Sequence, residues 1–263
     1  MKKIKLVEEL AKHPFVKQLM DDINPIIDEK FREILDRAKN GDLRSKVGSE
    51  MEDSKWYRYE IFQKLSGLFS VLDRIVHAHS FLQVFPMPRT YAKRCEITQD
   101  IWIDYHFLYY MFSVVSLFDC ILILTNAVFR IGLKDQDCKR NAIIKNYWVR
   151  KIGFDLTLKE FESISRRYKE TRDLHLHRGK GKNIADFTQN DNLTFLNITS
   201  FLQLYGDKIL PQNSIDLGYE IEVSDIIQLI ETEVTEINNV IDKIFSVLHI
   251  RYNEQRKPLK NDV

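Results

Sequence analysis

The sequence of residues 107–129 is FLYYMFSVVSLFDCILILTNAVF, which is the most apolar part of the chain. Apolar residues occupy nearly every face of a helix formed by this stretch, and such a helix is typical of a protein core. Its length alone would also suit a transmembrane span. Asp119 lies at its centre, however, and two serines, a threonine and an asparagine dilute the apolar run. We therefore expect a central helix, from Gln99 to about Ile131, that neighbouring helices bury on most sides.

Two ionisable residues of this helix, His106 and Asp119, allow two interpretations. They could line a polar cleft, or they could be core residues whose hydrogen bonds are made within the protein. The second is the commoner situation for buried polar groups, and we expect it for both residues.

The segments on both sides of the central helix have the 3.6-residue spacing of apolar residues that is typical of amphipathic helices. The 263 residues include only nine glycines and six prolines, and nearly all of these lie between the periodic segments. We therefore expect an all-α protein. The helices expected in chain order are residues 4–22 with a disturbance at Pro14, 25–39, 49–85, 99–131, 135–150, 157–178 and 225–251, with a loop at 206–219.

Capping signals place three of these helix starts. Asn24 followed by Pro25 has the form of an N-cap and first helical residue, residues 49–52 form a capping box, and Ser224 is expected to cap the last helix. The helix after residue 49 is expected to bury Trp56, Tyr59, Phe62, Leu65, Leu68, Leu72 and Val76. The last helix is expected to bury Ile226, Ile230, Val234, Ile237, Ile241, Ile244 and Leu248.

The sequence Phe85-Pro86-Met87-Pro88 interrupts the helical pattern. Because two prolines so close together cannot continue a helix, this is the best candidate for a subdomain boundary. We expect an N-terminal helical extension of residues 1–89 packed on the core, a helical bundle of residues 90–254, and a frayed tail of residues 255–263.

The composition, with 44% hydrophobic and 29% charged residues, is that of an ordinary soluble protein. The net charge of +1 gives no whole-chain footprint for nucleic acid, so affinity for RNA would require a local patch. No P-loop, GxGxxG, HExxH or GxSxG pattern occurs, which removes the enzyme classes that depend on them.

The cysteines and the N-terminus predict a cytoplasmic protein. Cys95, Cys120 and Cys138 are far apart, without metal-binding spacing, which favours reduced thiols. The basic N-terminus is interrupted by Glu8 and Glu9 before any apolar run, so no signal peptide is expected.

The tightest grouping of chemically useful residues is Arg172-Asp173-Leu174-His175-Leu176-His177. It lies near the end of the helix expected at 157–178, which starts with a Thr157–Glu160 capping box and stops before Gly179. The apolar stripe expected to face the core is Leu158, Phe161, Ile164, Tyr168 and Thr171, and Arg172 and His175 continue it.

The spacing within this motif leaves a geometric question open. Asp173 and His177 are four residues apart, so the carboxylate can hold the imidazole. Arg172 and His177 are five apart and therefore point about 140° away from each other on a regular helix. Either the helix unwinds between His175 and Gly179, or the two residues meet through a second copy of the protein. A helix end that merely collects cations, which favour the helix dipole, is the alternative.

Arg172-Asp173-x-x-x-His177, followed by Arg178-Gly179, resembles the signature of the HEPN superfamily of all-helical domains. That signature is an arginine and a histidine separated by four to six residues, the first usually polar; His175 does not fit it. The resemblance covers mainly residues 98–251 and implies a HEPN-like up-and-down helical bundle. Many members are metal-independent endoribonucleases of toxin–antitoxin, CRISPR or phage-defence systems, and others are non-catalytic modules.

The resemblance implies roles for the motif residues. His177 would transfer a proton, Arg172 would hold phosphate oxygens, and Asp173 would orient His177. Arg178, Lys180 and Lys182 are candidates for binding the RNA strand. No metal or cofactor is implied.

The implied assembly is a homodimer whose two motifs share one cleft, and an antitoxin or a nucleotidyltransferase is the kind of protein partner expected. The rival hypothesis is a non-catalytic helical module that binds RNA, a nucleotide or a protein. A further candidate surface is the basic segment 135–151, where Tyr147 and Trp148 could stack on bases beside the motif; a solvated charged face is the commoner meaning of such a run.

Overall fold

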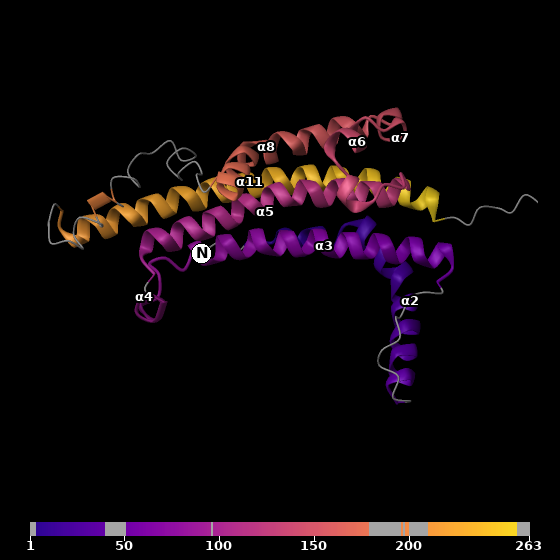
Figure 1. Ribbon diagram of the computed structural model, residues 1–263, viewed down its shortest axis with the longest axis horizontal. Coiled ribbons are helices and arrows are strands. Elements are labelled where there is room, and N and C mark those ends of the chain that lie inside the picture. The colour runs from indigo at the N-terminus through magenta and orange to yellow at the C-terminus, as the bar shows by residue number, and fades with distance from the viewer. Residues whose placement is uncertain are drawn as a thin grey trace, which may run out of the picture. The chain divides into compact units, whose positions relative to one another are not determined.

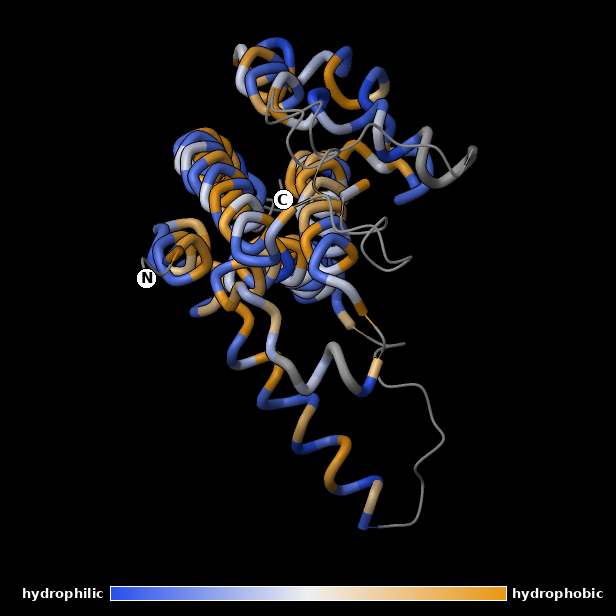
Figure 2. The backbone as a smooth tube through the Cα atoms, turned by 90° about the vertical axis from the view of Figure 1, so that its left-hand side faces the viewer, coloured by the Kyte–Doolittle hydropathy of each residue, from blue (hydrophilic) through white to orange (hydrophobic). Residues whose placement is uncertain are grey.

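A computed structural model describes residues 4–39, 51–95, 97–178, 196, 198–199 and 210–256. These residues form helices and no strand, which confirms the all-α prediction. The helices of the described residues, most of which are labelled in Figure 1, are α1 Leu6–Leu10, α2 Pro14–Lys39, α3 Asp53–Leu82, α4 Arg89–Cys95, α5 Gln99–Phe129, η1 Asp135–Asp137, α6 Arg140–Ile144, α7 Tyr147–Lys151, α8 Phe154–Arg178 and α11 Gln212–Gln255. Figure 2 shows hydrophobic and hydrophilic residues interspersed along the chain.

The chain forms two compact units, and neither is a continuous segment. The first unit comprises Met1–Leu6, Val71–Leu117 and Glu162–Asn238, and the second comprises Val7–Ser70, Phe118–Phe161 and Asn239–Val263. Helices α3, α5, α8 and α11 contribute residues to both. Residues from before and after position 89 occur in each unit; the division into an extension at 1–89, a bundle at 90–254 and a tail at 255–263 stays a prediction.

Helix α5 lies where the sequence places it, from Gln99 to Phe129. In the described part of the chain it is the one helix long and apolar enough to cross a membrane, and 61% of its most apolar window is buried within the protein. The hydroxyls of Ser113 and Thr125 donate to backbone carbonyls one turn earlier, those of Tyr109 at 2.7 Å and Ile121 at 2.8 Å. The Asn126 amide bonds to both backbone groups of Leu133.

The two residues of α5 that were considered for a polar cleft, His106 and Asp119, differ from the expectation. Asp119 is exposed, because it lies on a face of α5 that the rest of the protein leaves open. His106 is buried, as expected, but its Nδ1 has no hydrogen-bond partner within the described residues.

Several predicted helix boundaries are wrong, and at three of them packing overrides a local signal. Helix α2 continues through Pro25, which is exposed, while Ile23 and Ile26 on either side are buried and hold the helix together. Residues 135–151 form η1, α6 and α7 instead of one helix, since the chain turns to bury Ile143 and Val149.

The third wrong boundary is the start of the last helix. Helix α11 begins at Gln212 and runs through the predicted loop and past Ser224. Gly218 is accepted inside it because an added Cβ would lie 2.7 Å from the Leu196 side chain, so the glycine permits a close approach. Buried Ile215 and Tyr219 extend the apolar stripe toward the start of the helix. The stripe predicted from Ile226 to Leu248 is confirmed, since all seven of its residues are buried.

The buried face of α3 is partly different from the prediction. Tyr57 and Ile61 are buried, whereas Trp56 is 45% exposed. The reason is tertiary: the Tyr57 hydroxyl donates to the carbonyl of Val128 at 2.9 Å, and the Arg130 guanidinium covers the Tyr57 ring at 4.1 Å. From Leu65 to Leu72 the predicted face is buried as expected.

Candidate functional site

Helix α8 carries the Arg172 motif and starts earlier than the capping box indicates. It begins at Phe154, not after Thr157. Phe154 is buried and its ring stacks on Phe129 at 5.7 Å between centroids, so a tertiary contact fixes the first turn. The predicted core stripe is confirmed: Leu158, Phe161, Ile164, Tyr168 and Thr171 are all buried.

A buried carboxylate on α11 anchors α8 one turn before Arg172. Glu233 is 3% exposed and accepts hydrogen bonds from Tyr110 at 2.7 Å, from Tyr168, and from Arg167 at 3.0 Å. Burial, with the neighbouring carboxylate, raises the pKa of both tyrosines, so their hydroxyls remain donors. Arg167 also contacts Glu236 at 3.2 Å. These bonds fix the rotation of α8 and thereby the direction in which Arg172 leaves the helix.

Arg172 and Asp173 lie together at the edge of the first unit. The Asp173 carboxylate accepts from Arg172 Nε at 3.1 Å and pairs with its Nη2 at 3.1 Å. The side chains are 22% and 43% exposed respectively. Asp173 thus holds the guanidinium in a half-buried position, whereas the expected Asp173–His177 contact lies outside the described side chains.

The backbone of α8 shows whether the helix unwinds between His175 and Gly179. It remains α-helical through His177 to Arg178, so the unwinding considered between His175 and Gly179 does not occur within the described residues. The backbone positions of residues 172 and 177 are therefore about 140° apart around the helix axis. The side chains of His175, His177 and Arg178 lie outside the described residues.

The remaining candidate residues lie in other parts of the sequence than the Arg172 motif. Lys180 and Lys182 lie outside the described residues. Tyr147 and Trp148 are 64% and 50% exposed, as stacking surfaces require. They belong to the second unit and Arg172 belongs to the first, so the expected position beside the motif stays a prediction.

The first unit holds further titratable groups outside the Arg172 motif. His79 is buried against Glu231 at 3.3 Å, and burial lowers its pKa. Burial likewise lowers the pKa of His106, whose ring stacks on Phe81 at 4.7 Å. Burial, assisted by the charge of Asp100, raises the pKa of Asp104 to about 6. In the sequence, only the apolar residues between these titratable groups indicate that the groups are buried.

Replacing Asp104 by asparagine is expected to stabilise the protein at neutral pH and not in acid. The folded-state pKa of about 6 exceeds the ordinary value of 3.8. The contribution of the Asp104 carboxyl group to the free energy of unfolding is therefore fully present below pH 3.8 and is lost as the pH rises through 6. After allowance for partial exposure, the gain in unfolding free energy at neutral pH is about 1–2 kcal/mol. Urea unfolding of both proteins across this pH range measures it. A difference that does not change with pH would contradict the assignment.

Comparison with known proteins adds no family: no family model, no curated protein and no solved structure matches this chain.

Proposed function

We propose that this protein is a HEPN-like endoribonuclease that cleaves single-stranded RNA without a metal ion. The observation that carries the proposal is the position of Arg172: a half-buried arginine, paired with Asp173, at the end of a helix that is anchored one turn earlier. The resemblance to HEPN proteins also supports the proposal, because the motif Arg172-Asp173-x-x-x-His177 occurs on an all-helical chain. In this proposal the helices form a HEPN-like up-and-down bundle.

The chemistry uses the nucleophile that RNA itself supplies. His177 accepts the proton of a ribose 2′-OH, which attacks the adjacent phosphorus while the bond to the 5′-oxygen of the next nucleotide breaks. Arg172 holds the phosphate oxygens by bidentate hydrogen bonds as negative charge develops on them. The products are an upstream fragment with a 2′,3′-cyclic phosphate and a downstream fragment with a 5′-OH.

The proposed assembly is a cytoplasmic homodimer with a shared cleft. The backbone positions of residues 172 and 177, about 140° apart around a regular helix, support an arrangement in which a second copy supplies one of the two residues. Two copies related by a two-fold axis can bring the arginine of one subunit to the histidine of the other. An antitoxin or a nucleotidyltransferase encoded with it would be the partner that restrains such an enzyme.

The purified chain is expected to cleave single-stranded RNA in the presence of EDTA. A substrate with 2′-deoxyribose at the cleavage position should resist, because it lacks the nucleophile. Mass spectrometry of the upstream fragment should show a cyclic phosphate. Cleavage that requires added Mg²⁺, or that leaves a 5′-phosphate, would contradict the mechanism. Absence of cleavage with retained binding of RNA or protein would favour the non-catalytic module.

A further inference from the structure

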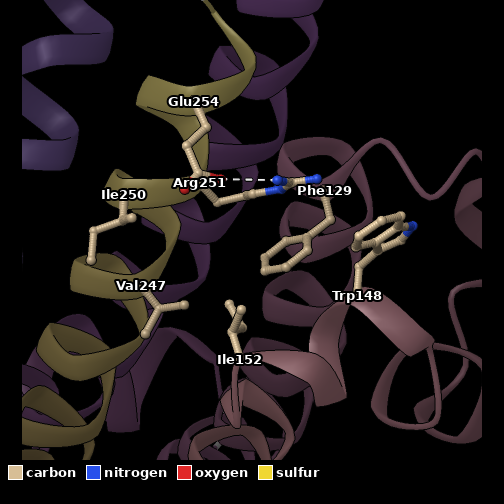
Figure 3. A pocket seen from close by; sticks show the side chains of 7 residues that line it. All are labelled: Phe129, Trp148, Ile152, Val247, Ile250, Arg251 and Glu254. Carbon is tan, nitrogen blue, oxygen red and sulfur yellow. Dashed lines mark hydrogen bonds and ion pairs between the residues drawn. The ribbon is translucent and has the colours of Figure 1, made fainter.

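The second unit has a small apolar pocket with a cation at its rim. It has a volume of about 210 Å³, below the roughly 300–1,000 Å³ typical of sites for drug-sized ligands, so it suits a single planar ring system. Its walls come from the end of α5, from α7 and the residue after it, and from α11. The lining residues are Phe129, Trp148, Ile152, Val247, Ile250, Arg251 and Glu254 (Figure 3).

The polar groups of this pocket are one arginine and its partner. The Arg251 guanidinium lies 5.5 Å from the centroid of the Phe129 ring and 6.0 Å from that of Trp148. Arg251 pairs with Glu254 at 2.9 Å, which neutralises that carboxylate (Figure 3). The buried Arg251 Nε has no hydrogen-bond partner in the described part of the protein. The pocket therefore offers a ligand apolar and aromatic walls with a guanidinium among the lining groups.

The surface next to the pocket is aromatic and cationic. Tyr147 and Trp148 are exposed, and the Lys151 ammonium lies 5.8 Å and 5.3 Å from their ring centroids. Residues 138–154 contain no aspartate or glutamate. The five basic residues of this segment, all exposed, are Lys139, Arg140, Lys145, Arg150 and Lys151.

We propose that this pocket binds one unpaired base of a single-stranded RNA, whose phosphates follow the basic segment 138–154. The base packs against Trp148 and Phe129, as bases do on the aromatic side chains of single-strand-binding proteins. The Arg251 guanidinium lies beside the base, and Lys151 contacts an adjacent phosphate. The exposed cations match the charge of the strand. This inference rests on the proposed ribonuclease function, because it names residues outside the Arg172 motif that hold the same RNA substrate.

Binding can be measured without cleavage in the His177→Ala chain. Fluorescence anisotropy with a labelled, unstructured RNA of about 12 nucleotides, within the usual site sizes, gives the dissociation constant from about 50 to about 200 mM salt. Trp148→Ala is expected to weaken binding by about 5- to 100-fold with an unchanged salt dependence. Lys151→Gln is expected to reduce the slope of log K against log salt by about 0.7, the value for one phosphate contact with a single strand.

Matched controls separate the pocket from general effects. Trp56→Ala removes another exposed indole of the second unit, and Lys134→Gln removes an exposed lysine outside the basic segment; neither should change binding. Ile250→Trp, at a 65% exposed position, should fill the pocket and weaken binding without removing a ring. Circular dichroism checks that each variant folds.

The outcomes of this experiment are distinct from those of the cleavage test. Unchanged affinity in both Trp148→Ala and Ile250→Trp overturns the base pocket, whether or not the wild type cleaves RNA. No RNA binding at all by the His177→Ala chain also overturns it. Weakened binding by both variants supports the pocket even where cleavage fails, and a raised KM with unchanged kcat for Trp148→Ala supports it where cleavage succeeds.

Discussion

Replacing either Arg172 or His177 by alanine is expected to abolish RNA cleavage, with a loss of at least about 10²-fold for each residue. The arginine stabilises charge on the phosphate, and the histidine removes the proton from the attacking hydroxyl, so neither can substitute for the other. His175→Ala is the matched control, because its spacing does not fit the motif and its loss should be much smaller. Initial rates on one labelled RNA measure all three. Wild-type cleavage by the His177→Ala protein would refute the assignment.

Mixing the two inactive proteins tests how the dimer divides the work. If the arginine of one subunit acts with the histidine of the other, a mixed dimer has one intact composite site and recovers up to half of the activity. If each subunit supplied its own pair, no mixed dimer would be active. The regular helix from Phe154 to Arg178 favours recovery. Different affinity tags on the two chains allow the mixed dimer to be isolated.

Replacing Glu233 by alanine is expected to lower the free energy of unfolding by about 3–5 kcal/mol. The hydroxyls of Tyr110 and Tyr168, which are 0% and 1% exposed as residues, would lose their buried acceptor. The Arg167 side chain is 46% exposed, so its guanidinium can bond to water instead and contributes little to the loss of stability. Equilibrium urea unfolding measures the change.

The control for this prediction is Glu236→Ala. Glu236 bonds to the same arginine but is 44% exposed, and an exposed ion pair contributes only about 0–1 kcal/mol. Combining Glu233→Leu with Tyr110→Phe and Tyr168→Phe should restore part of the lost stability, since no polar group is then left unpaired. Equal losses for Glu233→Ala and Glu236→Ala would show that burial of the carboxylate is not what matters.

The sequence by itself determined the features that depend on local periodicity. The all-α class, the position of α5 and the buried stripe from Ile226 to Leu248 on α11 follow from apolar residues repeated every three or four positions. The stripe on α8 from Leu158 to Thr171 follows for the same reason. Such a pattern fixes which side of a helix must leave water, whatever that side later packs against.

Only the tertiary structure decided the features that depend on a distant partner. Gly218 marks a loop by local rules and lies inside α11 because Leu196 approaches it. Pro25 does not end α2, because Ile23 and Ile26 are both buried. Glu233 finds its tyrosines 65 and 123 residues away in sequence. Packing free energy gained between distant segments outweighs the small local preferences that mark caps and breaks, so a single sequence does not reveal these contacts.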